Sequence, residues 1–218
     1  QTITFAPIER QVYDENPMPI ILRKETDKGL PISYVVEDES IATVTGCNLN
    51  ILKPGMTTIT ALQPGDKNYL PAESVTQTLT IDKASQRILI DNIESRPYAS
   101  PDFELEKSSD KGLPITYTSD NEAVATVNGN TIHIIGVGTC NITATQAGNE
   151  YYNAAASVTL PFTVTKAYQT ITFGQIKEAV YGDAPIRLSA NSTSALDVYF
   201  ESSDENIAKI DGCNAIIV

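Results

Sequence analysis

The sequence repeats itself at a long, fixed interval. The string KGLPISY at residues 28–34 returns as KGLPITY at residues 111–117, which is 83 residues later. The strings IATV (41–44) and TITA (58–61) return at the same offset as VATV and NITA. A third copy opens at residue 169 with QTITF, the five residues that also begin the chain. Such self-similarity marks an array of like modules, and this period suits a small self-contained domain better than a solenoid turn.

The repeat divides the chain into two full modules, at residues 1–84 and 85–167, and a truncated third module at 168–218. Nothing after residue 210 corresponds to the last two strands of the first two copies, so we expect the third sheet to have an open edge. Leu188, together with Ile171 and Phe173, should then lose much of its cover. Two interpretations stay open: the natural chain continues, which we favour, or another molecule supplies strands by strand exchange.

Apolar and polar residues alternate within each copy. Ile115 and Tyr117, like Ile132 and Ile134, lie two positions apart, which is the period of a half-buried strand. Turn residues interrupt at short intervals, and Thr, Val, Ile and Tyr are plentiful. The pattern predicts an all-β chain of tandem immunoglobulin-like β-sandwiches with about seven strands each. In the first module we expect the first strand at 2–5 and the last at 75–81.

The repeated wording also resembles a known family. The motif runs GLPITYTS-x-N-x-x-VATV-x-GN, then G-x-GT-x-x-ITATQAGN-x-x-Y-x-AA and a closing T-V-x-K. It resembles the bacterial immunoglobulin-like (Big/MBG-type) repeats arrayed in surface and secreted proteins of Bacteroidetes, over nearly all of the chain. The resemblance implies an extracellular or cell-surface location, with the targeting signal outside this segment. It implies no catalytic residue, no cofactor and no particular substrate.

Composition narrows the classes of partner. The net charge is −12 and the isoelectric point is near 4.4. Phosphate binding needs Lys and Arg, so nucleic acids and anionic membranes are not expected partners. No apolar run is long enough to span a bilayer, and no signal peptide opens the chain, so direct membrane insertion is not expected. A protein or a glycan at the cell surface is the remaining class of partner.

The residues offer little chemistry. The one histidine, His133, alternates with Ile132 and Ile134, so it points away from the core and lacks partners for catalysis or zinc. The string GVG at 136–138 is a turn between strands, and without a following helix it cannot hold a phosphate. We therefore predict no catalytic, cofactor-binding or metal residue, and a protein that is not an enzyme.

Acidic loops recur at equivalent positions in the three copies. Asp and Asn side chains start turns by bonding to nearby backbone, which is the preferred interpretation. Clustered carboxylates also suit calcium, although no EF-hand spacing is present. The residues of this alternative calcium set are Glu37, Asp38, Glu39, Asp120, Glu122, Asp204 and Glu205.

The three cysteines are expected to be unpaired thiols. Cys47 and Cys213 occupy equivalent hairpin turns in separate modules, which rarely approach within disulfide range. Cys140 alternates with Ile142 and Ala144, so we predict a buried free thiol.

Two further features concern the ends of the modules. Tyr69 and Tyr152 precede the last strands, and we expect their rings to cover the end of a sandwich and their hydroxyls to bond to backbone. The linkers, at residues 82–85 and 166–168, are short and lack Gly and Pro. We hypothesise a stiff rod of modules stacked end to end.

These features favour a non-catalytic structural or adhesive stalk of a bacterial cell-surface or secreted protein. The alternative is an accessory glycan- or protein-binding module of an extracellular enzyme or adhesin. The absence of Trp weakens the glycan alternative, because sugars stack on aromatic rings.

Overall fold

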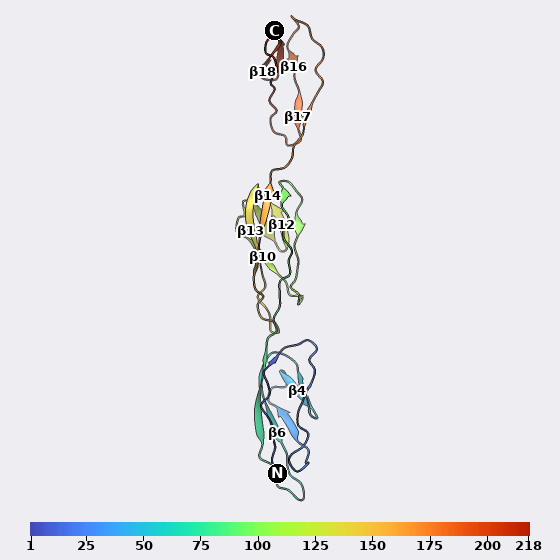
Figure 1. Cartoon of the computed structure of the whole chain (residues 1–218), viewed down its shortest axis with the longest axis vertical. Coiled ribbons are helices and arrows are strands. Elements are labelled where there is room, and N and C mark those ends of the chain that lie inside the picture. Colours follow the sequence, from blue (N-terminus) through green and yellow to red (C-terminus); the bar gives the residue numbers. More distant parts are fainter.

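The computed structural model describes residues 1–218 and consists of strands without helices. Figure 1 shows three modules following one another along the long axis, with the two termini at opposite ends. The predicted fold class, tandem immunoglobulin-like sandwiches with an incomplete third, is confirmed. No helix of the length and apolar character needed to cross a bilayer is present.

The first module is a sandwich of a four-stranded and a three-stranded sheet. The strand orders are β1-β7-β6-β3 and β2-β5-β4, and β1 pairs with β7 in parallel. The strands are β1 (Gln11–Val12), β2 (Ile20–Ile21), β3 (Ser33–Val36), β4 (Ala42–Thr45), β5 (Asn48–Ile51), β6 (Gly55–Leu62) and β7 (Val75–Asp82).

The prediction of a first strand at 2–5 is wrong. Ile3 and Phe5 do enter the core, as their alternation indicated. Their backbone, however, makes only scattered bonds, such as the one that the Phe5 carbonyl accepts from the Gln77 side chain. The first strand is β1, because that segment runs beside the end of β7 and pairs with it.

The second module repeats this architecture. Its sheets have the orders β10-β13-β14-β8 and β11-β12-β9, and β8 pairs with β14 in parallel. Gly138 lies opposite Val164, as Gly55 lies opposite Ile81, so the repeat in sequence is also a repeat in register. The strands are β8 (Arg96–Pro97), β9 (Phe103–Glu104), β10 (Thr116–Ser119), β11 (Ala125–Asn128), β12 (Thr131–Ile134), β13 (Gly138–Thr145) and β14 (Val158–Thr165).

Each of these two modules has its own hydrophobic core. One cluster draws only on residues 3–81 and the other only on residues 88–164. Phe162 and Val164 fill the second core from β14, whereas Val158 and Leu160, which alternate with them on the same face of the strand, are half-buried. Because the cores are separate, a core mutation is expected to destabilise the module that carries it.

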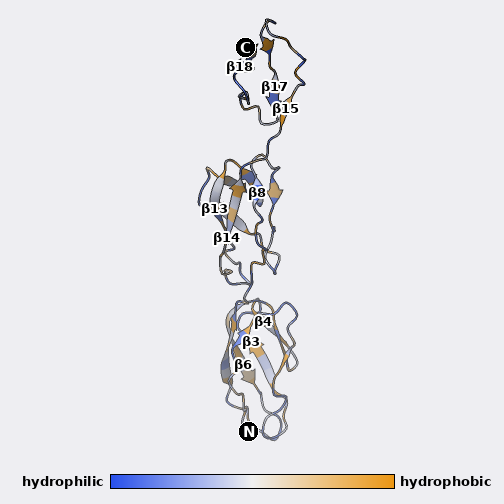
Figure 2. Cartoon of the chain, turned by 45° about the horizontal axis from the view of Figure 1, so that its top comes forward, coloured by the Kyte–Doolittle hydropathy of each residue, from blue (hydrophilic) through white to orange (hydrophobic).

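The third module has no counterpart of β6 and β7. As a result Ile171 is 61% exposed, whereas its equivalent in the first module, Ile3, is 5% exposed. Figure 2 shows the apolar β15 beside the open side of this module. Leu188 stays buried, against expectation, because the adjoining β16 pairs with β19. The strands are β15 (Ile171–Phe173), β16 (Ile186–Arg187), β17 (Ala190–Ser192), β18 (Ala208–Asp211) and β19 (Asn214–Ile217).

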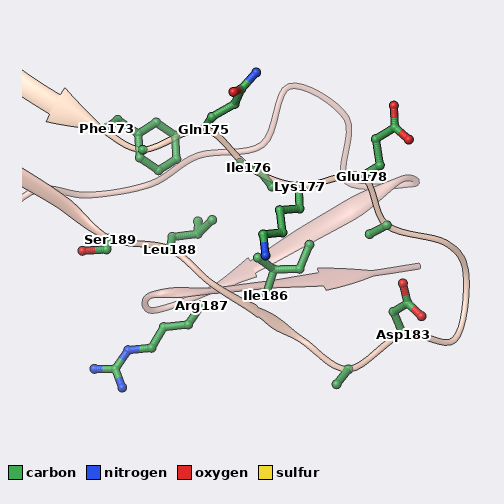
Figure 3. A pocket seen from close by; sticks show the side chains of 13 residues that line it. Phe173, Gln175, Ile176, Lys177, Glu178, Asp183, Ile186, Arg187, Leu188 and Ser189 are labelled. Atoms are coloured by element: carbon green, nitrogen blue, oxygen red, sulfur yellow. The ribbon is translucent and has the colours of Figure 1, made fainter.

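A hollow of ≈ 560 Å³ remains in this open sandwich. Figure 3 shows Phe173, Ile176 and Leu188 around it, with the Lys177 side chain reaching toward Ile186 and the Arg187 side chain pointing away. The complete modules have a hollow at the same place, of ≈ 420 Å³ beside Phe5, Ile8 and Leu22 in the first and of ≈ 290 Å³ beside Ile90, Ile93 and Phe103 in the second. The hollow therefore belongs to the module architecture and is not a consequence of the missing strands.

Candidate functional site at the junction of modules one and two

The site begins where β1 and β7 end together. The Tyr13 backbone N–H donates to the Asp82 carbonyl at 2.8 Å, which fixes Tyr13 beside the start of the linker. The Arg10 guanidinium binds the Asp82 carboxylate, with one N–O distance of 2.5 Å, and this hydrogen bond holds the pKa of Asp82 below its usual value. The end of the first module therefore presents Tyr13 next to the linker.

A loop of the second module meets this end. Gly148 has φ +80°, and a Cβ atom there would lie 2.4 Å from the Tyr152 carbonyl oxygen, so the position requires glycine. The Asn149 side-chain oxygen accepts hydrogen bonds from the Tyr151 and Tyr152 N–H groups, both at 2.8 Å. This Asx turn places two adjacent tyrosines at the tip of the module.

The tyrosines of the two modules pack against each other. The Tyr13 ring lies 5.0 Å from Tyr151 in a tilted arrangement and 6.1 Å from Tyr152 edge-on, measured between ring centroids. The Tyr152 hydroxyl donates to the Glu15 carboxylate of the first module. Tyr152 is 6% exposed as a result. The expected bond from this hydroxyl to backbone is wrong, because the contact that covers Tyr152 comes from the neighbouring module.

The linker is held by its backbone. The Ala84 N–H donates to the Tyr151 carbonyl at 3.0 Å, and the Ala84 carbonyl accepts from the Asn153 N–H at 2.9 Å. The Asn153 side chain donates to the Lys83 carbonyl at 3.0 Å, and the Lys83 ammonium donates to the Asn149 carbonyl at 2.6 Å. Bending the chain at this linker would therefore break several hydrogen bonds at once.

A buried polar cluster supports the loop from inside the second module. The Gln86 side chain donates to the Gln146 side chain and to the Asn153 carbonyl, the latter at 2.8 Å. Ser109 donates to the Gln86 side-chain oxygen at 2.7 Å, and the Gly148 N–H donates to Gln146 at 2.6 Å. Sequence reasoning missed this cluster, although the recurrence of Gln in QTITF, SQRIL, QPG and QAG was its signal. The first-module counterparts are Gln1, Gln63, Thr26 and Gly65.

The hydroxyl contact predicts a titration at high pH. Its bond to Glu15 raises the pKa of Tyr152 to about 12 from the ordinary value of 10.0. Because the protonated phenol is the bonded form, the contact is complete below pH 10 and is lost as pH rises through about 12. Ultraviolet phenolate absorbance should show the last-ionising component disappear in Tyr152→Phe and move toward pH 10 in Glu15→Gln. Because the chain has ten tyrosines, the contribution of Tyr152 is the difference between the unaltered chain and Tyr152→Phe, and a difference that titrates near pH 10 would contradict the contact.

The acidic loops lie elsewhere, and their side chains bond either within their own turns, as at Asp38 and Asp204, or to a neighbouring strand, as at Asp120 and Glu37. The Asp38 carboxylate accepts from the Ser40 hydroxyl and N–H at 2.6 and 2.9 Å, and Asp204 accepts from the Asn206 N–H at 2.9 Å. The Asn141 N–H and amide donate to Asp120 at 2.7 Å each and lower its pKa. Glu37 accepts from the Thr58 hydroxyl, while Glu39, Glu122 and Glu205 are exposed; no three such side chains converge.

The histidine and the cysteines are separate from the junction. His133 Nδ1 lies 2.6 Å from an Asp102 carboxylate oxygen on the surface of the second module. Cys47, Cys140 and Cys213 are free thiols. Cys140 is buried, which confirms its prediction, and burial raises the pKa of its thiol.

No protein-family model and no curated protein matches the chain. Solved structures do. A Drosophila N-cadherin EC1–4 fragment is 11% identical with a TM-score of 0.32, and the match covers 98% of this chain and 66% of that one. Domains 1–6 of the surface layer protein SbsC are 14% identical with a TM-score of 0.34, covering 82% and 26%. Human CDH23 EC21–23 is 13% identical with a TM-score of 0.31, covering 97% and 91%.

Proposed function

We propose that the chain is a structural spacer, a stalk segment that holds other parts of a bacterial cell-surface or secreted protein at a distance. The observation that carries this proposal is the junction of modules one and two. A flexible tether needs only a covalent linker, whereas here the linker backbone is paired and three tyrosine rings pack across the boundary. Such contacts resist bending, so the two modules keep one orientation.

The sequence resemblance supports the location. The repeat is similar to immunoglobulin-like repeats of Bacteroidetes surface proteins, which implies a bacterial, extracellular setting. An acidic chain with a net charge of −12 fits a soluble surface protein better than a partner of nucleic acids. An adhesive contribution would come from the domains that the stalk displays.

The test compares two equivalent tyrosines. Tyr13→Ala removes both ring pairs, worth together about 1–3 kcal/mol, and should raise the fraction of bent molecules by about 5-fold to 150-fold. Tyr98 follows β8 as Tyr13 follows β1, with its N–H donating to the Thr165 carbonyl at 2.8 Å, but it has no ring partner. Tyr98→Ala is therefore the matched control.

The readout is the NMR alignment tensor of each module, obtained from residual dipolar couplings. One common tensor is expected for modules one and two in the unaltered chain and in Tyr98→Ala, and two different tensors in Tyr13→Ala. Independent tensors in the unaltered chain would show a hinge and refute the spacer. Well-dispersed amide spectra establish that each variant is folded.

A further inference from the structure

We infer that the loop of residues 63–71, at the N-terminal end of module one, is a preformed docking site for the tyrosine-bearing end of another module of this kind. The inference rests on the proposed function, because it extends the observed junction to a second pair of surfaces. Its partner is a sandwich end that carries a tyrosine after its β1-type strand and a carboxylate two residues later.

The loop has the docking geometry without a partner. Gly65 has φ +84°, close to the value at Gly148. The Asp66 carboxylate accepts from the Asn68 and Tyr69 N–H groups, both at 2.8 Å, and the Asp66 N–H donates to the Tyr69 carbonyl at 2.9 Å. Asn149 makes the same three bonds in module two, at 2.8, 2.8 and 3.0 Å. The conformation is thus set within the module.

The groups that would meet a partner are free. Tyr69 is 40% exposed, against 6% for the docked Tyr152, and Leu70 is 85% exposed. Module two pairs its Tyr151 carbonyl and Asn153 N–H with the linker. The counterparts in module one, the Asn68 carbonyl and the Leu70 N–H, have no hydrogen-bond partner. Unpaired strand-like backbone beside an exposed tyrosine is the state of a docking surface before assembly.

The charge of the loop in module one indicates which kind of module end can dock on it. Lys67 stands where module two has Glu150, so the loop in module one favours an acidic partner. The end of module one offers Asp14 and Glu15 after its tyrosine, whereas the end of module two offers Ala99 and Ser100. The loop therefore matches an end of the Tyr13 type, whose carboxylate would accept the Tyr69 hydroxyl.

The first experiment moves the loop to a known partner. In the full chain, Asn149→Asp, Glu150→Lys, Tyr151→Asn and Asn153→Leu give residues 149–153 of module two the sequence of residues 66–70 of module one, while Tyr152 is kept. If that sequence docks, modules one and two retain the common alignment tensor of the unaltered chain. The control adds Tyr152→Ala and should give two different tensors. Different tensors in the loop-exchanged chain would overturn the inference.

The second experiment supplies a partner to the original loop. A second copy of residues 1–85 is joined directly before Gln1 of the full chain, which keeps the linker as long as that between modules one and two, and hydrogen exchange of the Leu70 amide is measured. Docking should slow this exchange at least tenfold, and Glu15→Lys in the added copy should restore fast exchange by repelling Lys67. Unchanged exchange would overturn the inference. The exchange rate of the Leu70 amide tests the docking inference even if modules one and two of the unaltered chain tumble independently, a result that would refute only the proposed spacer function.

Discussion

Phe162→Ala is expected to lower the free energy of unfolding of module two by about 3–5 kcal/mol, the cost of removing a large buried aromatic side chain. Phe162 is 0% exposed and its ring lies 5.5 Å from that of Phe103, so the substitution leaves a cavity between the sheets. Small domains have only about 5–15 kcal/mol of stability, so the variant loses a large share of the stability of the module. Hydrogen exchange resolved by module, along a urea series, measures the change.

Module one provides the matched control. Leu79 occupies the register position of Phe162 and is also fully buried, so Phe162→Leu introduces a residue that this architecture already uses. We expect a cost of about 1–2 kcal/mol, because the cavity is smaller. Exchange in module one should be unchanged in both variants, since the two cores share no residue. Equal destabilisation of both modules would contradict separate cores.

Gly148→Ala is expected to destabilise the junction loop by about 3 kcal/mol or more and to release Tyr152. A non-glycine residue in the left-handed region costs about 1–2 kcal/mol by itself. The added Cβ would also meet the Tyr152 carbonyl oxygen at 2.4 Å and the Asn153 carbonyl carbon at 2.8 Å. Because both are backbone atoms, the loop has to change shape, and modules one and two should acquire different alignment tensors.

Gly129→Ala separates the cost of a left-handed backbone conformation from the cost of a steric clash of the added Cβ. Gly129 has φ +63° in the β11–β12 hairpin, and an added Cβ there has no atom within 4 Å. This variant should cost only the conformational penalty of about 1–2 kcal/mol and leave the common alignment tensor intact. If the two glycine variants had equal effects on stability and alignment, the close approach at Gly148 would not be what shapes the junction.

The sequence by itself determined the modules and most of their strands. An 83-residue period and a two-residue alternation are local or repeated signals, and they need no knowledge of which surfaces meet. They predicted the all-β class, the burial of Cys140 and the open third sandwich. The predicted first strand at residues 2–5 was wrong. The alternation of apolar residues indicated their burial correctly, but it could not show that the backbone there has no strand to pair with.

Only the tertiary structure decided what the tyrosines do. Tyr69 and Tyr152 have the same local turn, yet one is exposed and the other is covered. The difference comes from Glu15 and Tyr13, which lie more than 130 residues from Tyr152 in sequence. A side chain's neighbours across a boundary depend on how two folded modules are placed, and no periodicity within one module encodes that placement.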